Sequence, residues 1–209
     1  KISFIAILGA LPLVGLADEG ENIYTKGGSQ PQALACITCH GAEGKGLPAA
    51  GYPNITGMPA GYLSKQLFDF QDGTRSHAIM DGIAGALSEE EIEAVAEYME
   101  SLPVTEVPLI TRAATPTDEG SKIALRGDWA KQIPECVACH GPSGVGVGEA
   151  FPRLAGQSSA YIVNQINAWK NGTRTNDPND LMGHIAKSLT DDQAKAVAIY
   201  FETIGQQGD

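Results

Sequence analysis

The cysteines are the residues whose spacing points most directly to chemistry. The chain has four cysteines, and all of them lie in two Cys-x-x-Cys-His motifs. If each motif forms one helical turn, its two thiols can form thioether bonds to the two vinyl groups of a haem, and the histidine can bind the iron from one side. The residues are Cys36, Cys39 and His40 in the first motif and Cys136, Cys139 and His140 in the second. The pattern therefore predicts two covalently bound haem c groups.

Other uses of cysteine fit this arrangement less well. Four cysteines in an exported protein would normally form two disulfides, but here no cysteine lies outside the two motifs. A zinc module separates its two Cys-x-x-Cys pairs by only about 15 to 20 residues. A thioredoxin-like redox pair needs strands that alternate with helices, and the sequence does not show that alternation. The repeated motif therefore favours haem attachment.

The sequence around the motifs is an internal repeat. Pro53 to Arg75 matches Pro152 to Arg174 at an offset of 99, and Met80 to Tyr98 matches Met182 to Tyr200 at an offset of 102. The second copy gains three residues in the Asn-Asp-Pro segment around Pro178. The repeat predicts two homologous domains, residues 18–102 and 118–209, joined by an extended, proline-containing linker at 103–117.

The first 17 residues differ in character from both copies. One positive charge, an apolar run from Ile2 to Leu16 and the small residues Gly15 and Ala17 predict a secretory signal in residues 1–17, cleaved after Ala17. The run is short for a membrane span of about 20 residues, and a retained N-terminal anchor is the alternative. In both cases the rest of the chain is expected outside the cytoplasm.

Both domains are expected to be all-α. Ser88 with Glu91 forms a capping box, and Thr190 with Gln193 repeats the signal in the second copy. A middle helix of the second domain is expected to start near Ser158. The side that it is expected to bury consists of Tyr161, Ile162, Gln165 and Trp169. Domains of this size are marginally stable, so we expect the covalent porphyrin to supply part of each core.

Methionine is the expected second axial ligand of each iron. The second domain contains only Met182, and the repeat aligns it with Met80 rather than with Met58 or Met99. A ligand retained through duplication should occupy the same place in both copies. The neighbouring histidines, His77 and His184, do not align, so they are expected at the surface or at the haem edge. Met58 and Met99 are expected to pack in a core.

Further expectations concern the groups around the haem. The carbonyl of Pro53 or Pro152 can accept a hydrogen bond from the ring of the motif histidine in the same copy and so orient that ring. Arg75 and Arg174 can neutralise haem propionates, because guanidinium pairs well with carboxylate. The alternative for both arginines is a cation at the end of a helix.

The charge of the chain excludes one class of partner and suggests another. The net charge is −11, so nucleic-acid binding is not expected. Residues 18–102 hold 13 acidic and 4 basic side chains, whereas residues 118–209 hold 11 and 8. Six glutamates crowd the helix that closes the first domain, and the alternatives are a solvated face or steering of a basic partner. They are Glu89, Glu90, Glu91, Glu93, Glu97 and Glu100.

His/Met ligation occupies both axial positions of each iron, so no position is left for a substrate. The chain is therefore expected to be an electron-transfer protein and not an enzyme. A dihaem peroxidase is the rival interpretation, and the two matched methionines argue against it.

The sequence resembles the dihaem cytochromes c of the cytochrome c4 family. The resemblance rests on the two Cys-x-x-Cys-His-Gly motifs, on "FPRLAGQSSAYIVNQINAWKNGTR" in the second half and on a methionine about 40 residues after each haem histidine. The first copy departs from this, since "YPNITGMPAGYLSKQLFDFQDGTR" lacks the Leu-Ala-Gly-Gln wording.

The resemblance implies two tandem class I cytochrome c domains, with haem propionates near the domain interface. It implies a periplasmic electron carrier, often associated with the membrane. Such carriers pass electrons from a quinol-oxidising cytochrome bc complex to a terminal haem-copper oxidase. Related chains are the electron-accepting subunit of a periplasmic dehydrogenase that oxidises sulfur compounds or alcohols.

Overall fold

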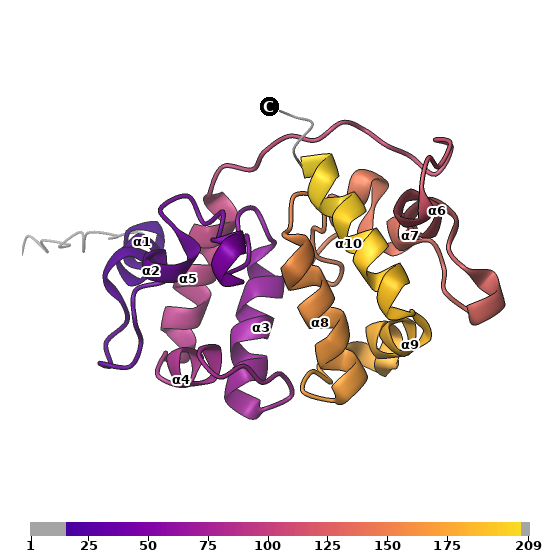
Figure 1. Cartoon of the computed structure of the whole chain (residues 1–209). Helices are drawn as coiled ribbons and strands as arrows, with labels where there is room; N and C mark the ends of the chain where they lie inside the picture. Colours follow the sequence, from indigo (N-terminus) through magenta and orange to yellow (C-terminus); the bar gives the residue numbers. More distant parts are fainter. Residues whose placement is uncertain (1–15, 206–209) are drawn as a thin grey trace, which may run out of the picture.

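The two copies of the repeat fold into two helical lobes that lie side by side (Figure 1). The computed structural model describes residues 16–205. The first lobe contains α1 (Leu16–Lys26), α2 (Ile37–His40), α3 (Ala60–Asp72), α4 (Met80–Ala84) and α5 (Glu89–Ser101), with a 3-10 turn, η1, at Pro48–Ala50. The second contains α6 (Glu119–Arg126), α7 (Cys136–His140), α8 (Ser159–Asn171), α9 (Leu181–Ser188) and α10 (Asp191–Gly205), with 3-10 turns η2 (Trp129–Lys131), η3 (Pro142–Gly144) and η4 (Pro178–Asp180).

The all-α expectation is confirmed for the described residues, in which β-pairing is limited to isolated bridges. The predicted signal segment, residues 1–17, lies outside them except for Leu16 and Ala17, which begin α1. Within residues 16–205, no helix is both long and apolar enough to cross a membrane.

The first and last helices of each lobe cross at very short range. A Cβ atom added to Gly20 of α1 would lie 2.2 Å from the carbonyl oxygen of Ala94 in α5. The equivalent Cβ on Gly120 of α6 would lie 2.2 Å from the carbonyl oxygen of Ala196 in α10. Only glycine permits this approach of two backbones. The repeated glycine therefore sets the same crossing in both lobes.

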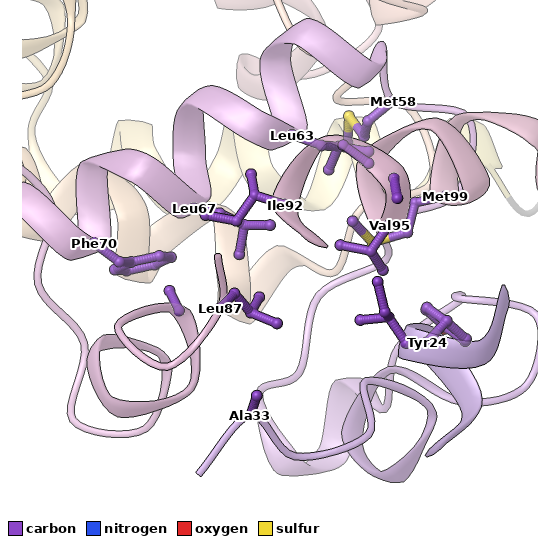
Figure 2. Packing of buried hydrophobic residues seen from close by; sticks show 14 residues of the cluster. Tyr24, Ala33, Met58, Leu63, Leu67, Phe70, Leu87, Ile92, Val95 and Met99 are labelled. Carbon is purple, nitrogen blue, oxygen red and sulfur yellow. The ribbon is translucent and has the colours of Figure 1, made fainter. Parts of the chain in front are cut away.

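The core of the first lobe lies between α1, α3 and α5. Figure 2 shows Leu63 and Leu67 of α3 close to Ile92 and Val95 of α5. Met58 and Met99 belong to the same cluster and are 7% and 5% exposed, as expected for methionines that pack in a core. The second core is built in the same way from α6, α8 and α10, and its members include Ile123, Ile162, Ile166, Val197 and Phe201.

The start of each closing helix follows the sequence signals. Ser88 Oγ accepts a hydrogen bond from the backbone N–H of Glu91, and the Glu91 carboxylate accepts one from the N–H of Ser88. Thr190 and Gln193 exchange the equivalent pair of bonds at 3.1 Å each. Ser158 caps α8, since its Oγ accepts from the N–H of Tyr161 at 3.1 Å. Both capping boxes are thus confirmed.

The face of α8 differs from the prediction in one respect. Ile162 and Ile166 of α8 are buried in the core of the second lobe, and Trp169 packs against that core, as predicted for Ile162 and Trp169. Tyr161 and Gln165 instead hydrogen-bond to Arg75 of the first lobe. The helix therefore buries two faces, one in its own core and one against the other lobe.

The linker is extended, as predicted, but it is also fastened to the second lobe (Figure 1). The Ser143 hydroxyl donates to the carbonyl of Pro108 at 2.6 Å, and the backbone N–H of Ile110 donates to the same hydroxyl at 2.7 Å. The guanidinium of Arg153 donates to the carbonyl of Thr105 at 2.7 Å. Val107 and Ile110 pack against the second core. The segment is therefore a strap on the second lobe and not a free tether.

Candidate haem sites

The two cysteine motifs form short helical turns in equivalent places. The backbone N–H of His40 donates to the carbonyl of Cys36 at 2.9 Å, which closes one turn across the first motif. Cys136–His140 forms α7 in the second lobe. All four cysteines are free and half-buried. Each motif thus presents two unpaired thiols and one histidine, which is the set that haem attachment requires.

The ring of each motif histidine is oriented by a backbone carbonyl. His40 Nδ1 lies 3.1 Å from the carbonyl oxygen of Pro53, and His140 Nδ1 lies 2.8 Å from that of Pro152. Burial lowers the pKa of both histidines below the ordinary value, which favours the neutral ring. With Nδ1–H donating to the proline carbonyl, the lone pair of Nε2 is available to an iron. The geometry therefore matches the expected role of both prolines.

The two aligned methionines begin equivalent helices. Met80 is the first residue of α4, and Met182 is the second residue of α9. Both side chains are half-buried, whereas His77 and His184 are exposed. His77 Nδ1 lies 3.4 Å from the backbone N–H of Met80 and accepts a long hydrogen bond from it. His77 thus contacts the backbone at the candidate ligand.

Apolar side chains are exposed at equivalent positions near both candidate sites. Leu47 and Val147 follow the two motifs at the same distance and are 53% and 50% exposed. Ile79 and Leu181 each precede an aligned methionine, and both are 44% exposed. Large apolar side chains that recur in the same exposed place mark a binding surface. The porphyrin is an apolar group that can cover them, so the residues present fit a haem in each lobe.

The two cysteine motifs lie in different lobes, one at α2 and the other at α7. Among residues 16–205, no group of three or more histidine, cysteine, aspartate or glutamate side chains is placed to hold a metal ion.

Arg75 and Arg174 lie in the contact between the lobes. They are 7% and 5% exposed, and their backbones form an isolated antiparallel bridge. Arg75 donates to Gln66 of its own lobe at 3.0 Å and to Tyr161 and Gln165 of the other at 2.7 and 3.0 Å. Arg174 repeats the pattern: it donates to Gln165 of its own lobe and to Tyr62 and Gln66 of the other.

This contact buries more positive than negative charge. The side-chain acceptors of both guanidinium groups are neutral amide and phenol oxygens. The nearby carboxylate of Asp69 is 9% exposed and is already paired with Lys65 at 2.6 Å. A buried charge without an opposite charge is costly. The contact is therefore suited to additional anionic groups.

The sequence predicts Tyr161 and Gln165 on the buried side of the middle helix, with Tyr62 and Gln66 as their repeat matches, but it does not predict that these four residues contact the two arginines. Gln66 with Gln165 and Tyr62 with Tyr161 supply the acceptors for both arginines. In the sequence, these residues are recognisable as polar side chains that both copies keep on an otherwise apolar face of a helix. That signal indicates a buried polar contact but does not identify the partner.

The acidic surface of α5 is smaller than the sequence suggested. Glu91 is buried, at 8% exposure, and points inward to the helix N-terminus. Glu100 accepts from the backbone N–H of Ala60 at 3.1 Å. Glu89, Glu90, Glu93, Glu97 and Glu100 are exposed on α5, and Asp18, Glu19 and Glu21 are exposed on the adjacent α1.

Comparisons with known proteins agree with this geometry. The sequence matches the family described as cytochrome c twice, over residues 17–103 and 118–205. A relative from Stutzerimonas stutzeri (strain A1501), described as a thiosulfate dehydrogenase electron acceptor, is 53% identical over 197 residues, which cover 94% of this chain and 91% of the relative. A cytochrome c4 from Pseudomonas aeruginosa is 33% identical over 202 residues, which cover 95% of this chain and 96% of the relative.

A solved structure resembles the whole described fold. The thiosulfate dehydrogenase of Marichromatium purpuratum matches with a TM-score of 0.79 at 36% identity, over 90% of this chain. The matched part is 40% of that protein's chain. The present sequence thus corresponds to less than half of the length of that protein.

Proposed function

Since this chain belongs to the cytochrome c family, as a dihaem electron-transfer protein related to cytochrome c4, we propose that it accepts electrons from a thiosulfate dehydrogenase. The observation that carries the proposal is the similarity, over nearly the whole chain, to a protein described as the electron acceptor of that enzyme. Two covalently bound haem c groups give the chain its ability to take up and release single electrons.

In this proposal the thioether bonds are made by Cys36 and Cys39 in the first lobe and by Cys136 and Cys139 in the second. His40 and His140 bind iron through Nε2, and their hydrogen bonds to Pro53 and Pro152 support this role. Met80 and Met182 are the opposite ligands. Their equivalent positions at the start of α4 and α9 support the assignment. Two filled axial positions suit electron transfer.

Arg75 and Arg174 are proposed to face the haem propionates across the contact between the lobes. The support is electrostatic, because both guanidinium groups are buried among neutral acceptors. A propionate from each haem would supply the missing negative charge.

A reduction assay tests the proposed donor. The oxidised holoprotein is mixed with thiosulfate and a catalytic amount of purified thiosulfate dehydrogenase, and the visible bands of the reduced haems are followed in a stopped-flow instrument. Reduction that needs both additions, and that is at least about tenfold faster than with an unrelated monohaem cytochrome c, is the expected result. Absence of reduction, while ascorbate reduces the same sample, would refute the proposed donor.

A free carrier between a quinol-oxidising cytochrome bc complex and a terminal haem-copper oxidase is the second candidate. The similarity to cytochrome c4 from Pseudomonas aeruginosa favours it. Purification from native membranes and soluble fractions separates the two. A dedicated subunit co-purifies stoichiometrically with the dehydrogenase, whereas a free carrier does not.

The proposed location is the periplasm. Haem attachment at two Cys-x-x-Cys-His motifs and the apolar N-terminal segment support export. Retention of residues 1–17 would give a membrane-associated form, and N-terminal sequencing of the native protein distinguishes the two.

A further inference from the structure

The three residues that the second copy gains lie between the contact of the two lobes and Met182. The gain falls in the Asn176-Asp177-Pro178 segment, which follows Arg174 and Thr175 and enters η4 at Pro178. An insertion without a structural role, in a surface loop, would make few contacts. Here Asn176 and Asp177 make hydrogen bonds in opposite directions, one toward the first lobe and the other toward the start of α9.

Asn176 is held by α3 of the first lobe. Its Nδ2 donates to Gln66 Oε1 at 2.9 Å and to Asp69 Oδ2 at 2.5 Å. Its backbone carbonyl accepts from Lys65 Nζ at 2.9 Å. The preceding residue, Thr175, donates its backbone N–H to the carbonyl of Thr74 at 2.7 Å. The insertion is therefore anchored on the first lobe by both side chain and backbone.

Asp177 is held by α8 and holds the turn that carries Met182. One carboxylate oxygen, Oδ1, accepts from Trp169 Nε1 at 2.8 Å. The other, Oδ2, accepts from the backbone N–H of Gly183 at 2.9 Å, directly after Met182. The N–H groups in the first turn of a helix lack a partner within the helix. Because Gly183 is buried, water is a poor substitute for the carboxylate.

The first lobe fastens its methionine differently. Phe70 takes the place of Trp169 and has no N–H to donate. The Asp81 carboxylate, which follows Met80, accepts from the backbone N–H of His77 at 2.7 Å and from Ser76 Oγ at 2.8 Å. All these residues belong to the Met80 loop itself. That loop reaches the other lobe through the backbone N–H of Ser76, which donates to the carbonyl of Thr173.

We propose that Asn176 and Asp177 are positioning residues for Met182, and that they couple ligation of the second haem to the contact with α3 of the first lobe. The proposal rests on Met182 being the axial ligand, as proposed above. Among the residues that the structure describes, no side chain of the Met80 loop makes an equivalent hydrogen bond to the second lobe, so the two methionines differ in how they are held. A substitution at Lys65 or Asp69 should then weaken ligation of the second haem by Met182.

Competition with imidazole tests the proposal in the ferric holoprotein. Imidazole displaces methionine from the iron, and the loss of the near-infrared sulfur-to-iron band reports the displacement. Asp177→Ala should strengthen imidazole binding at the second haem about tenfold, because a hydrogen bond to a charged group is lost. Trp169→Phe, which removes the Nε1–H donor but keeps an aromatic ring at the position that stacks on Arg174 and packs against the second core, should give a smaller change in the same direction. Asn176→Ala tests the link to the first lobe and should also act on the second haem.

Controls separate the coupling from its premise. Met182→Ala identifies the share of the band that belongs to the second haem. If that variant keeps the full band, the ligand assignment fails, whatever Asp177 does. Asp81→Ala is the matched control and should strengthen imidazole binding only at the first haem.

If Asp177→Ala strengthened imidazole binding equally at both haems, the variant would be generally destabilised and the proposal would be overturned. An unchanged second haem in Asp177→Ala and Trp169→Phe would overturn it as well. A change in Asp177→Ala without one in Asn176→Ala would refute the coupling to the first lobe.

Discussion

Glu91 offers a sharp test of how the closing helix of the first lobe is anchored. Its Oε2 accepts from the backbone N–H of Ser88 at 2.9 Å, and its Oε1 accepts from that of Ser29 at 2.5 Å. Ser29 lies in the loop that leads to Cys36. One carboxylate thus joins the N-terminus of α5 to the segment that carries the first haem motif.

Glu91→Ala removes two charge-assisted hydrogen bonds and one half of a capping box. Bonds to charged groups contribute about 1.5–3 kcal/mol each, but Ser29 and Ser88 are exposed, so water can partly replace the lost acceptor. We expect a loss of about 2 kcal/mol in the free energy of unfolding of the first lobe. For a domain of this size, that corresponds to a fall in Tm of about 10 °C. Glu93→Ala, on the exposed side of the same helix, should change stability by less than about 0.5 kcal/mol.

The pH dependence gives a second measure of the same contact. Burial by itself raises the pKa of Glu91, but the hydrogen bonds from Ser88 and Ser29 outweigh burial and lower the pKa below its ordinary value. A lowered pKa in the folded state adds stability above the ordinary value, and that stability is lost as the pH falls through the folded value. Glu91→Gln should therefore be less stable than the parent at neutral pH, and the difference should shrink as the pH falls below the ordinary glutamate pKa of about 4.3. Denaturant unfolding of the holoprotein, followed by circular dichroism and haem absorbance, measures it. A stability difference that is absent, or that stays constant over this pH range, would refute the reasoning.

Three further predictions test the haem sites and the partner surface. Met80→Ala and Met182→Ala should each remove about half of the near-infrared sulfur-to-iron band of the ferric protein, because each haem contributes one such bond; an undiminished band in either variant contradicts the ligand assignment. Cys36→Ser combined with Cys39→Ser should leave the first lobe largely unfolded, since the porphyrin supplies part of a small core; a normal far-ultraviolet helix signal would speak against this. Charge reversal at Glu90, Glu93 and Glu97 should flatten the ionic-strength dependence of the reaction with a basic partner, since screening shortens the Debye length from about 10 Å at 0.1 M to about 3 Å at 1 M; a rate that does not vary with salt in the parent protein would end the steering hypothesis.

Local features of the fold could be predicted from the sequence. Capping boxes depend on residues three apart, so Ser88 with Glu91 is recognisable without any tertiary information. The orientation of His40 by Pro53 was also predictable, because the repeat aligns Pro53, 13 residues after His40, with Pro152, 12 residues after His140. In both cases the interacting groups are close along the chain or fixed by the repeat.

Contacts between the lobes could not be predicted in the same way. A helical period shows that Tyr161 and Gln165 share a face with Ile162, but it does not show that this face is divided between a core and a second lobe. Glu91 was grouped with the surface acids, although its inward position could have been recognised from the capping box alone. The role of Asp177 depends on how Trp169 and Gly183 are placed relative to each other, and that depends on the packing of α8 against α9.

The contact around Arg75 and Arg174 has the form expected if the chain arose by duplication of a single domain that paired with itself. The two arginines and the residues that follow them make interactions that occur twice with the partners exchanged: Ser76 donates to Thr173 as Thr175 donates to Thr74, and Arg75 contacts Gln165 as Arg174 contacts Gln66. A surface on which residue i meets j and j meets i is isologous, the arrangement of a homodimer with a two-fold axis. An unduplicated copy would carry both halves of this contact and could pair with itself. Fusion of two such genes would preserve the pairing and free one copy to acquire the Asn176-Asp177 segment.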